Sequence, residues 1–203
     1  MKKLILTLFL SIAMNAQHNN IYKPNSEIVN AEASIIIPIG NLSNKFDYAQ
    51  SYGFWFKMAE DNGFAANIGF NALSLKNARP INYKFNDSIY TINSNKFGFD
   101  IGIRAVKIIP ISKNQKSYLE LGLTIGLDYL DYDFPSEETN DEETERDKYE
   151  LFKNTTILLA PEIKYMYNNI GLKFQYRFTP YNIDGFESKF GSSSISFGIV
   201  YKQ

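Results

Sequence analysis

The chain lacks several features that would assign it to a familiar functional class. It has no cysteine in 203 residues, which excludes disulfide bonds, thiolate metal sites and a lipid-modified cysteine. Beyond its first residues, no segment reaches the roughly 18 consecutive apolar residues of a membrane-spanning helix. The formal net charge is only −1, so the charge gives no indication of nucleic-acid binding. If this chain crosses a membrane, it must do so with strands.

The start of the chain has the pattern of a secretory signal peptide. Two lysines precede an apolar stretch over residues 4–13, which is too short to span a bilayer, and a small residue follows at Ala16. We expect cleavage after Ala16, so that residues 1–16 are a leader and residues 17–203 form one domain. Loss of the two lysines changes the formal charge to −1 − 2 = −3.

Apolar and polar residues alternate with a period of two along most of the mature chain. Such alternation predicts strands, because successive side chains on a strand point to opposite faces. Eight segments show it, at residues 30–39, 51–59, 64–75, 96–109, 117–131, 152–167, 170–179 and 193–202. Most are longer than the average soluble strand of about 5–6 residues and match the roughly 9–11 residues of a tilted transmembrane strand.

The connections between these segments alternate in length. The short ones lie near residues 60–63, 112–116 and 168–169, and the long ones near 40–50, 76–95, 132–151 and 180–192. Outer-membrane barrels sort their connections in this way, with short periplasmic turns and long outer loops. The expected fold is therefore all-β, an eight-stranded antiparallel up-and-down transmembrane β-barrel.

One face of the predicted strands is continuously apolar and aromatic, and the other is small or charged. In a membrane barrel the apolar face meets lipid, so we expect the charged face to fill the lumen. The predicted lumen charges are five acids and five bases: Glu32, Asp100, Glu120, Asp128, Glu162, Lys57, Arg104, Lys164, Lys173 and Arg177. A balanced set suits a narrow interior, since an unpaired buried charge is costly.

The lumen charges have two interpretations. They could form a path for ions or solutes, or a structural plug of salt bridges and hydrogen bonds. We favour the plug, because wide aqueous channels belong to barrels of about 16 strands. Trp55 falls on the inward phase beside Lys57, and we interpret it as part of the packing.

With these features the chain resembles the small outer-membrane β-barrel proteins, which are porin-like and similar to OmpA-type membrane domains. The resemblance rests on the leader, on Ser34–Leu42 opening the barrel, on glycine–aromatic strands such as Tyr52–Phe54, and on the last strand through Tyr201. It implies an outer-membrane location after export through the periplasm. It identifies an architecture and leaves the activity open, because fold does not fix function.

Two other features of the sequence are candidate sites. His18 lies beside the expected cleavage point, where it is too far from the barrel to act as the base of a catalytic pair. The acidic run at residues 137–147 offers oxygen ligands for calcium, or for magnesium bridging lipopolysaccharide, but it lacks the spacing and glycine of an EF-hand loop. We interpret it as a solvated loop. No catalytic, cofactor-binding or metal-binding residue is predicted.

The leading functional hypothesis is a non-enzymatic barrel with a structural, adhesive or envelope-integrity role and at most weak conductance. The alternatives are a secretion- or transport-linked barrel that acts through protein partners, and a soluble lipocalin-like carrier with its apolar face turned inward. A barrel enzyme acting on lipids is disfavoured by the single histidine. We expect a monomer with no cofactor and no nucleic-acid partner. The expected partners are membrane lipid, the export and barrel-assembly machinery, and proteins that meet the long loops.

Overall fold

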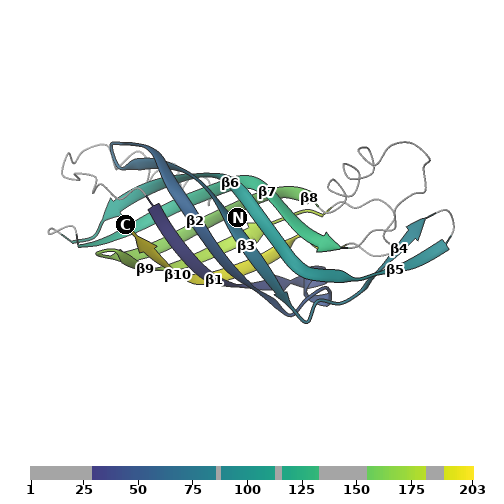
Figure 1. Ribbon diagram of the computed structural model, residues 1–203. Coiled ribbons are helices and arrows are strands. Elements are labelled where there is room, and N and C mark those ends of the chain that lie inside the picture. Colours follow the sequence, from purple (N-terminus) through teal and green to yellow (C-terminus); the bar gives the residue numbers. More distant parts are fainter. Residues whose placement is uncertain (1–28, 86–87, 113–115, 133–154, 182–189) are drawn as a thin grey trace, which may run out of the picture.

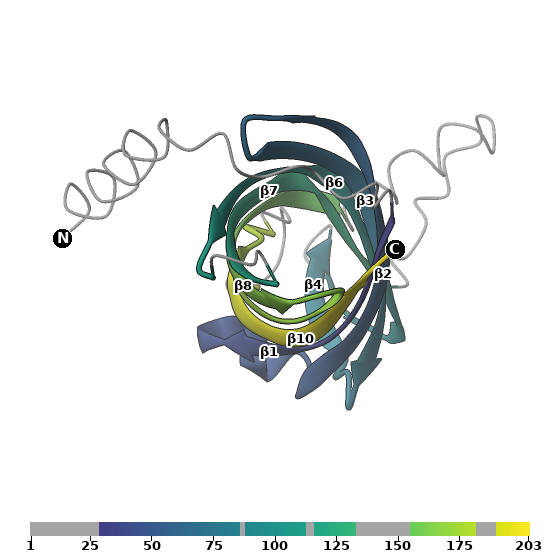
Figure 2. The same ribbon diagram turned by 90° about the vertical axis from the view of Figure 1, so that its left-hand side faces the viewer.

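A computed structural model describes residues 29–85, 88–112, 116–132, 155–181 and 190–203 (Figure 1). Eight antiparallel strands close into a barrel in the order β1-β10-β9-β8-β7-β6-β3-β2, so that strands adjacent in the barrel wall follow one another along the chain (Figure 2). Their bounds are β1 Val29–Ile39, β2 Tyr48–Asp61, β3 Phe64–Lys76, β6 Ser94–Pro110, β7 Ser117–Tyr132, β8 Thr155–Tyr167, β9 Ile170–Phe178 and β10 Ser193–Lys202. The expected up-and-down barrel fold is confirmed. The expected leader, His18 and the acidic run at 137–147 lie outside the described residues.

The barrel has two distinct ends. The three short connections lie at one end, which we call the base, together with Gln203 and the first described residue, Val29, whose main chains exchange two hydrogen bonds. At the opposite end, the mouth, lie the connection between β1 and β2 and the hairpin β4–β5 (Figure 1). The turn between β2 and β3 shows why the base is tight. Asn62 and Gly63 both have positive φ, of 49° and 74°, as a two-residue hairpin turn requires.

The long connection before β6 contains structure that the alternation did not predict. Residues 76–95 were expected to be a connection only, but β4 (Ile81–Phe85) and β5 (Ser88–Ile92) pair as a hairpin that projects from the mouth (Figure 1). A short 3-10 helix, η2 (Gly40–Asn44), lies in the preceding connection. Strand β2 also starts at Tyr48 rather than near residue 51.

The polarity of the two faces reverses along the strands as they approach the mouth. On β3, Ile68 and Phe70 face outward and Asn71 faces inward, but beyond Ala72 the outward residue is Lys76 and the inward residue is Leu75. Strands β2 and β7 show the same reversal. Toward the mouth, the outward residue next to Tyr52 is Gln50 and the outward residue next to Tyr129 is Asp131, whereas Ala49 and Leu130 are buried inside. The reversal marks the level at which the outer face leaves lipid and enters water.

Below that level the outer face forms a continuous apolar band. Ile103, Ile125 and Leu172 on this face are 54%, 60% and 64% exposed, which is the reverse of a water-soluble barrel. The eleven residues from Phe97 to Lys107 on β6 span roughly 25 Å along the barrel axis at the usual strand rise and tilt, which is the height of a transmembrane barrel's apolar band. The barrel is therefore built to span a bilayer. No described helix has the length and apolar character needed to cross one.

Candidate functional site

The structure places nine of the ten predicted lumen charges in buried positions inside the barrel. The exception is Lys57, which lies near the base with a partly exposed side chain and forms an ion pair with Glu60. Eight of the other nine form two groups at successive levels of the lumen, and the ninth, Glu120, pairs with Lys202 nearer the base. Together they are the most concentrated polar chemistry among the described residues.

The central group forms around Glu32 of β1. Its carboxylate receives two hydrogen bonds from Arg104, at 2.6 and 3.1 Å, and one each from Lys164, at 2.9 Å, and Lys173, at 2.7 Å. Glu162 supplies the second negative charge, 3.1 Å from Arg104 Nε and 3.0 Å from Lys164 Nζ. Because these residues come from β1, β6, β8 and β9, the group ties facing walls of the barrel together.

The second group lies closer to the mouth and forms around Arg177 of β9. Its guanidinium donates to Asp100 at 2.9 Å and to Asp128 at 2.6 Å. Asn71 donates to the other oxygen of Asp100, and the Tyr181 hydroxyl donates to the other oxygen of Asp128 at 3.0 Å. All four oxygens of the two carboxylates therefore have a partner.

The strand register explains why these charges reach across the lumen. Lys164 and Lys173 are direct neighbours on β8 and β9, and Asp100 and Asp128 are direct neighbours on β6 and β7. Like charges at opposed positions destabilise a strand pair. Each repulsive pair is bridged by one opposite charge from another strand, Glu32 for the lysines and Arg177 for the aspartates. The register thus makes the cross-lumen contacts a requirement of stable pairing.

Trp55 fills the space beside the central group. The Arg104 guanidinium lies over its indole ring, 3.7 Å from the ring centroid, in a cation–π contact. Across from Trp55 on β3 is Gly69, where a Cβ atom would lie only 2.5 Å from the indole Cδ2. Inward glycines continue this level around the wall at Gly102 and Gly126. Their small size gives the indole and the guanidinium the room they occupy.

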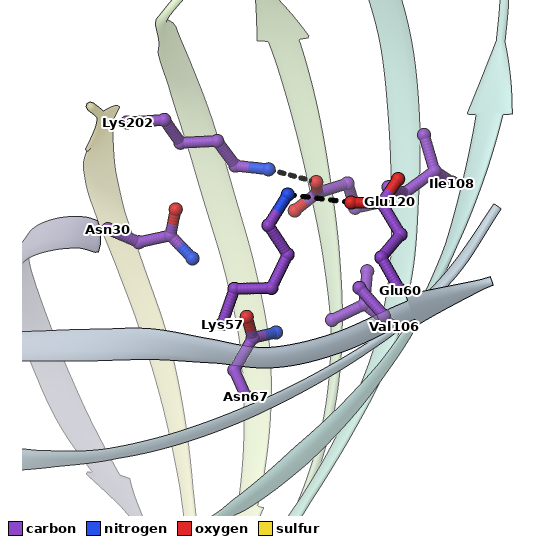
Figure 3. A pocket seen from close by; sticks show the side chains of 9 residues that line it. Asn30, Lys57, Glu60, Asn67, Val106, Ile108, Glu120 and Lys202 are labelled. Atoms are coloured by element: carbon purple, nitrogen blue, oxygen red, sulfur yellow. Dashed lines mark hydrogen bonds and ion pairs between the residues drawn. The ribbon is translucent and has the colours of Figure 1, made fainter. Parts of the chain in front are cut away.

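Near the base, two ion pairs face a small polar cavity. Lys202 pairs with Glu120, and Lys57 pairs with Glu60 at 2.6 Å (Figure 3). A bulge in β2 between Lys57 and Ala59 shifts the alternation, so both Lys57 and Glu60 face inward. The space open to the centre of a water molecule is about 20 Å³ here, enough for one or two waters. The size of the cavity excludes an organic solute.

Apolar layers cover the charges at both ends. Toward the mouth, residues of the strands, of η2 and of β4–β5 form a buried cluster: Ile36, Leu42, Phe46, Ala49, Leu73, Leu75, Ile81, Ile92, Leu130, Tyr132, Tyr181 and Phe190. We call these twelve residues the mouth core. At the base, Val106, Ile108, Tyr118, Met166 and Val200 form a smaller cluster. The lumen is therefore apolar toward the mouth and charged at its centre, and at the base apolar side chains lie beside ion pairs.

Three members of the network were missed at the level of the sequence. Lys202 shares the inward phase of the last strand but stands at its end, where a charge is easily interpreted as exposed. Regular alternation along β2 would place Glu60 on the outer face, and it faces inward only because of the bulge between Lys57 and Ala59. Tyr181 lies beyond β9 and reaches Asp128 from a connection, and no period-two signal could have found it. Asp100 and Arg104, four residues apart, bind different groups rather than each other.

The chemistry of the network is that of a cross-link. Its carboxylates are occupied by guanidinium, ammonium, amide and hydroxyl donors, and the described residues contain no cluster of three metal-ligating side chains.

Outside the barrel wall, Arg79 pairs with Asp47 and donates to the Ser43 carbonyl at 2.8 Å, which joins two mouth connections. The hydrogen bond from Asn77 and the charge of Arg79 lower the pKa of Asp47.

Comparisons with known proteins add a structural likeness. No protein-family model matches the chain, and no curated protein matches it. Among solved structures, that of Neisserial surface protein A is similar: it is 14% identical, the match covers 88% of this chain and 98% of that one, and the TM-score is 0.49. The fold assignment therefore rests on the barrel geometry of this chain itself.

Proposed function

We propose that this chain is a small outer-membrane barrel that does not conduct and that serves as a rigid anchor for the surface at its mouth. The observation that carries the proposal is the cross-lumen bonding of Glu32 to Arg104, Lys164 and Lys173. An open path for ions would have to pass this group, the Arg177 group and two apolar layers. A structural, adhesive or envelope-integrity role uses the outside of such a barrel.

The inner surface also argues against the carrier alternative. A soluble lipocalin-like carrier needs an apolar cavity and a polar exterior, whereas the inner wall here carries paired charges and the outer wall is apolar. A secretion- or transport-linked role would depend on protein partners at the mouth. It remains the second candidate, favoured by the β4–β5 hairpin that projects there (Figure 1).

Conductance tests the closed lumen. The purified, folded chain is reconstituted into a planar bilayer, and current is recorded over a range of voltages and salt concentrations. We expect insertion without stepwise conductance, because paired charges and apolar layers occupy the lumen. Steady, stepwise current from protein that is shown to be folded would contradict the proposal.

Cysteine labelling tests the location and the orientation. Because the chain has no cysteine, Ile89→Cys on the hairpin and Gln203→Cys at the base each introduce a single thiol. On intact cells of a bacterium with an outer membrane, a membrane-impermeant maleimide should label the first variant and should label the second only after permeabilisation. Recovery of the protein in the soluble periplasm without detergent, or the reverse labelling pattern, would refute the anchor model.

A further inference from the structure

Two lysines lie at the mouth-side ends of the neighbouring strands β3 and β6, where the outer face leaves the apolar band. The last residues paired between these strands are Ser74 and Phe97. Lys76 stands two residues beyond Ser74, and Lys96 stands one residue before Phe97, so both lie just past the mouth-side end of this ladder. The polarity reversal places both at the mouth-side edge of the band, at the level of lipid headgroups.

An irregular backbone keeps Lys96 on the outside. The register of β6 with β7 shifts between Ser94 and Gly98, and Lys96 has a positive φ of 60°, which is unusual for a residue other than glycine. Regular alternation from Gly98 would turn Lys96 toward the mouth core. Instead Asn95, Lys96 and Phe97 are all exposed. A strained backbone that presents a charge is a feature that calls for a functional reason.

The acids nearest this edge are already engaged. Asp47 is bound by Arg79 and Asn77, and Asp131 accepts a hydrogen bond from the Tyr129 hydroxyl at 3.1 Å. Among the described residues, neither Lys76 nor Lys96 has a carboxylate within salt-bridge distance. Both ammonium groups are therefore available to an external anion.

Directly below the lysines the surface is aromatic. Phe99 stacks on Tyr129 with ring centroids 4.9 Å apart, and Phe97 adjoins Phe99 at 6.4 Å. Phe97 and Phe99 are exposed on the lipid side. A lipid with an anionic headgroup and apolar chains would match this surface, because its headgroup would meet the lysines and its chains would meet the aromatic rings.

We propose that Lys76 and Lys96 bind the phosphates of a phosphorylated lipid of the outer leaflet, whose acyl chains pack on Phe97, Phe99 and Tyr129. Lysine binds phosphate as a point charge, and two neighbouring lysines suit a lipid that carries more than one phosphate. The inference rests on the proposed outer-membrane location, because it is the outer leaflet that the mouth would face.

The test measures lipid retained by the full, folded chain. Wild type and the double variant K76Q/K96Q, in neutral detergent, are titrated with diphosphoryl lipid A and analysed by native mass spectrometry. Since each basic residue at an anionic surface contributes roughly a fivefold gain in affinity, the double variant should bind about 25-fold more weakly. Monophosphoryl lipid A should bind wild type more weakly than the diphosphoryl form.

Lys107→Gln is the matched control. Lys107 lies on β6 at the base-side edge of the band, over the Phe64 ring and 3.1 Å from the Asn62 carbonyl, so it faces the other leaflet. Its loss should leave lipid A binding unchanged. Equal binding by K76Q/K96Q and wild type, or an equal loss in K107Q, would overturn the inference. If the lipid binding depends on the two lysines but cell labelling places the chain elsewhere, the outer-membrane location is refuted and the lipid site stands.

Discussion

Single residues decide whether the lumen stays closed, and Glu32 is the clearest case. Its carboxylate is the shared partner of Arg104, Lys164 and Lys173, all of which have side chains at most 3% exposed. Removal of one partner from a buried ion pair costs more than the pair contributes, because the remaining charge stays buried without compensation. The stability of the barrel should therefore respond strongly to a change at this position.

Glu32→Gln should lower the free energy of unfolding by about 3–5 kcal/mol, the usual cost of breaking a buried ion pair. Glutamine keeps the size of the side chain but leaves three cations with Glu162 as their main counter-charge. Urea titration of the chain folded in lipid vesicles measures the change. Asp47→Asn, at the exposed pair with Arg79, is the control and should change the stability little. Equal effects of the two variants would show that the network does not stabilise the barrel.

Gly69→Ala tests the packing around Trp55. The added Cβ would clash with the Phe54 carbonyl oxygen and lie 2.5 Å from the indole Cδ2, so the main chain of the neighbouring strand and the ring beneath Arg104 must both shift. We expect a loss of about 1–3 kcal/mol in stability, typical of overpacking. Trp55 is the only tryptophan, so its emission spectrum reports the displacement directly. Ala72→Leu, which adds bulk on the outer face of the same strand, should leave the emission unchanged. An unchanged spectrum in the glycine variant would contradict the tight packing.

At the scale of elements, the hairpin β4–β5 is the part of the molecule most separable from the barrel. It is attached through Ile81 and Ile92, which oppose each other in its register and are both buried in the mouth core. By contrast, Ile89 on the same strand as Ile92 is 58% exposed. The hairpin should therefore loosen without unfolding the barrel wall.

Ile92→Ser should detach the hairpin, because it removes about 2–4 kcal/mol of buried apolar packing and places a hydroxyl in the mouth core. The expected result is faster proteolytic cleavage between residues 81 and 92, with the rest of the barrel intact on a gel. Ile89→Ser makes the same chemical change on the exposed face and should leave the cleavage rate as in wild type. If both variants were cleaved equally fast, the hairpin would have no anchor in the mouth core.

The elements also show how far the sequence predicts this fold. The eight strands, the turn at Asn62 and Gly63, and the inward phase of Trp55 follow from period-two alternation and turn chemistry. The start of β2 at Tyr48 was missed, because above the band the outer face meets water and the polarity of the alternation reverses. Glu60 was missed because a bulge shifts the phase. The partners of each charge depend on strand register, which no single segment encodes.

The whole molecule combines three environments along one axis. The apolar band fits lipid, the charged lumen is closed by its own counter-charges, and the mouth core has the apolar interior and polar exterior of a soluble protein. Because the mouth core is packed independently of lipid, the strand ends, η2 and the β4–β5 hairpin that contribute to it form a firm platform. This arrangement suits a protein that presents a surface to the outside while its barrel remains closed.

Lysine substitutions on the outer face should show where the lipid lies. Ile125→Lys, at mid-band opposite Ile103, should cost about 2–4 kcal/mol of folding free energy in vesicles, whereas Ile170→Lys, at the base edge, should cost about 0–1 kcal/mol. Both isoleucines are about equally exposed, at 60% and 63%, so exposure alone predicts no difference. In a barrel surrounded by water, both changes would be close to neutral. Equal small costs in a reversible urea titration would mean that the apolar band does not meet the bilayer core, and a depth-dependent cost would place it there.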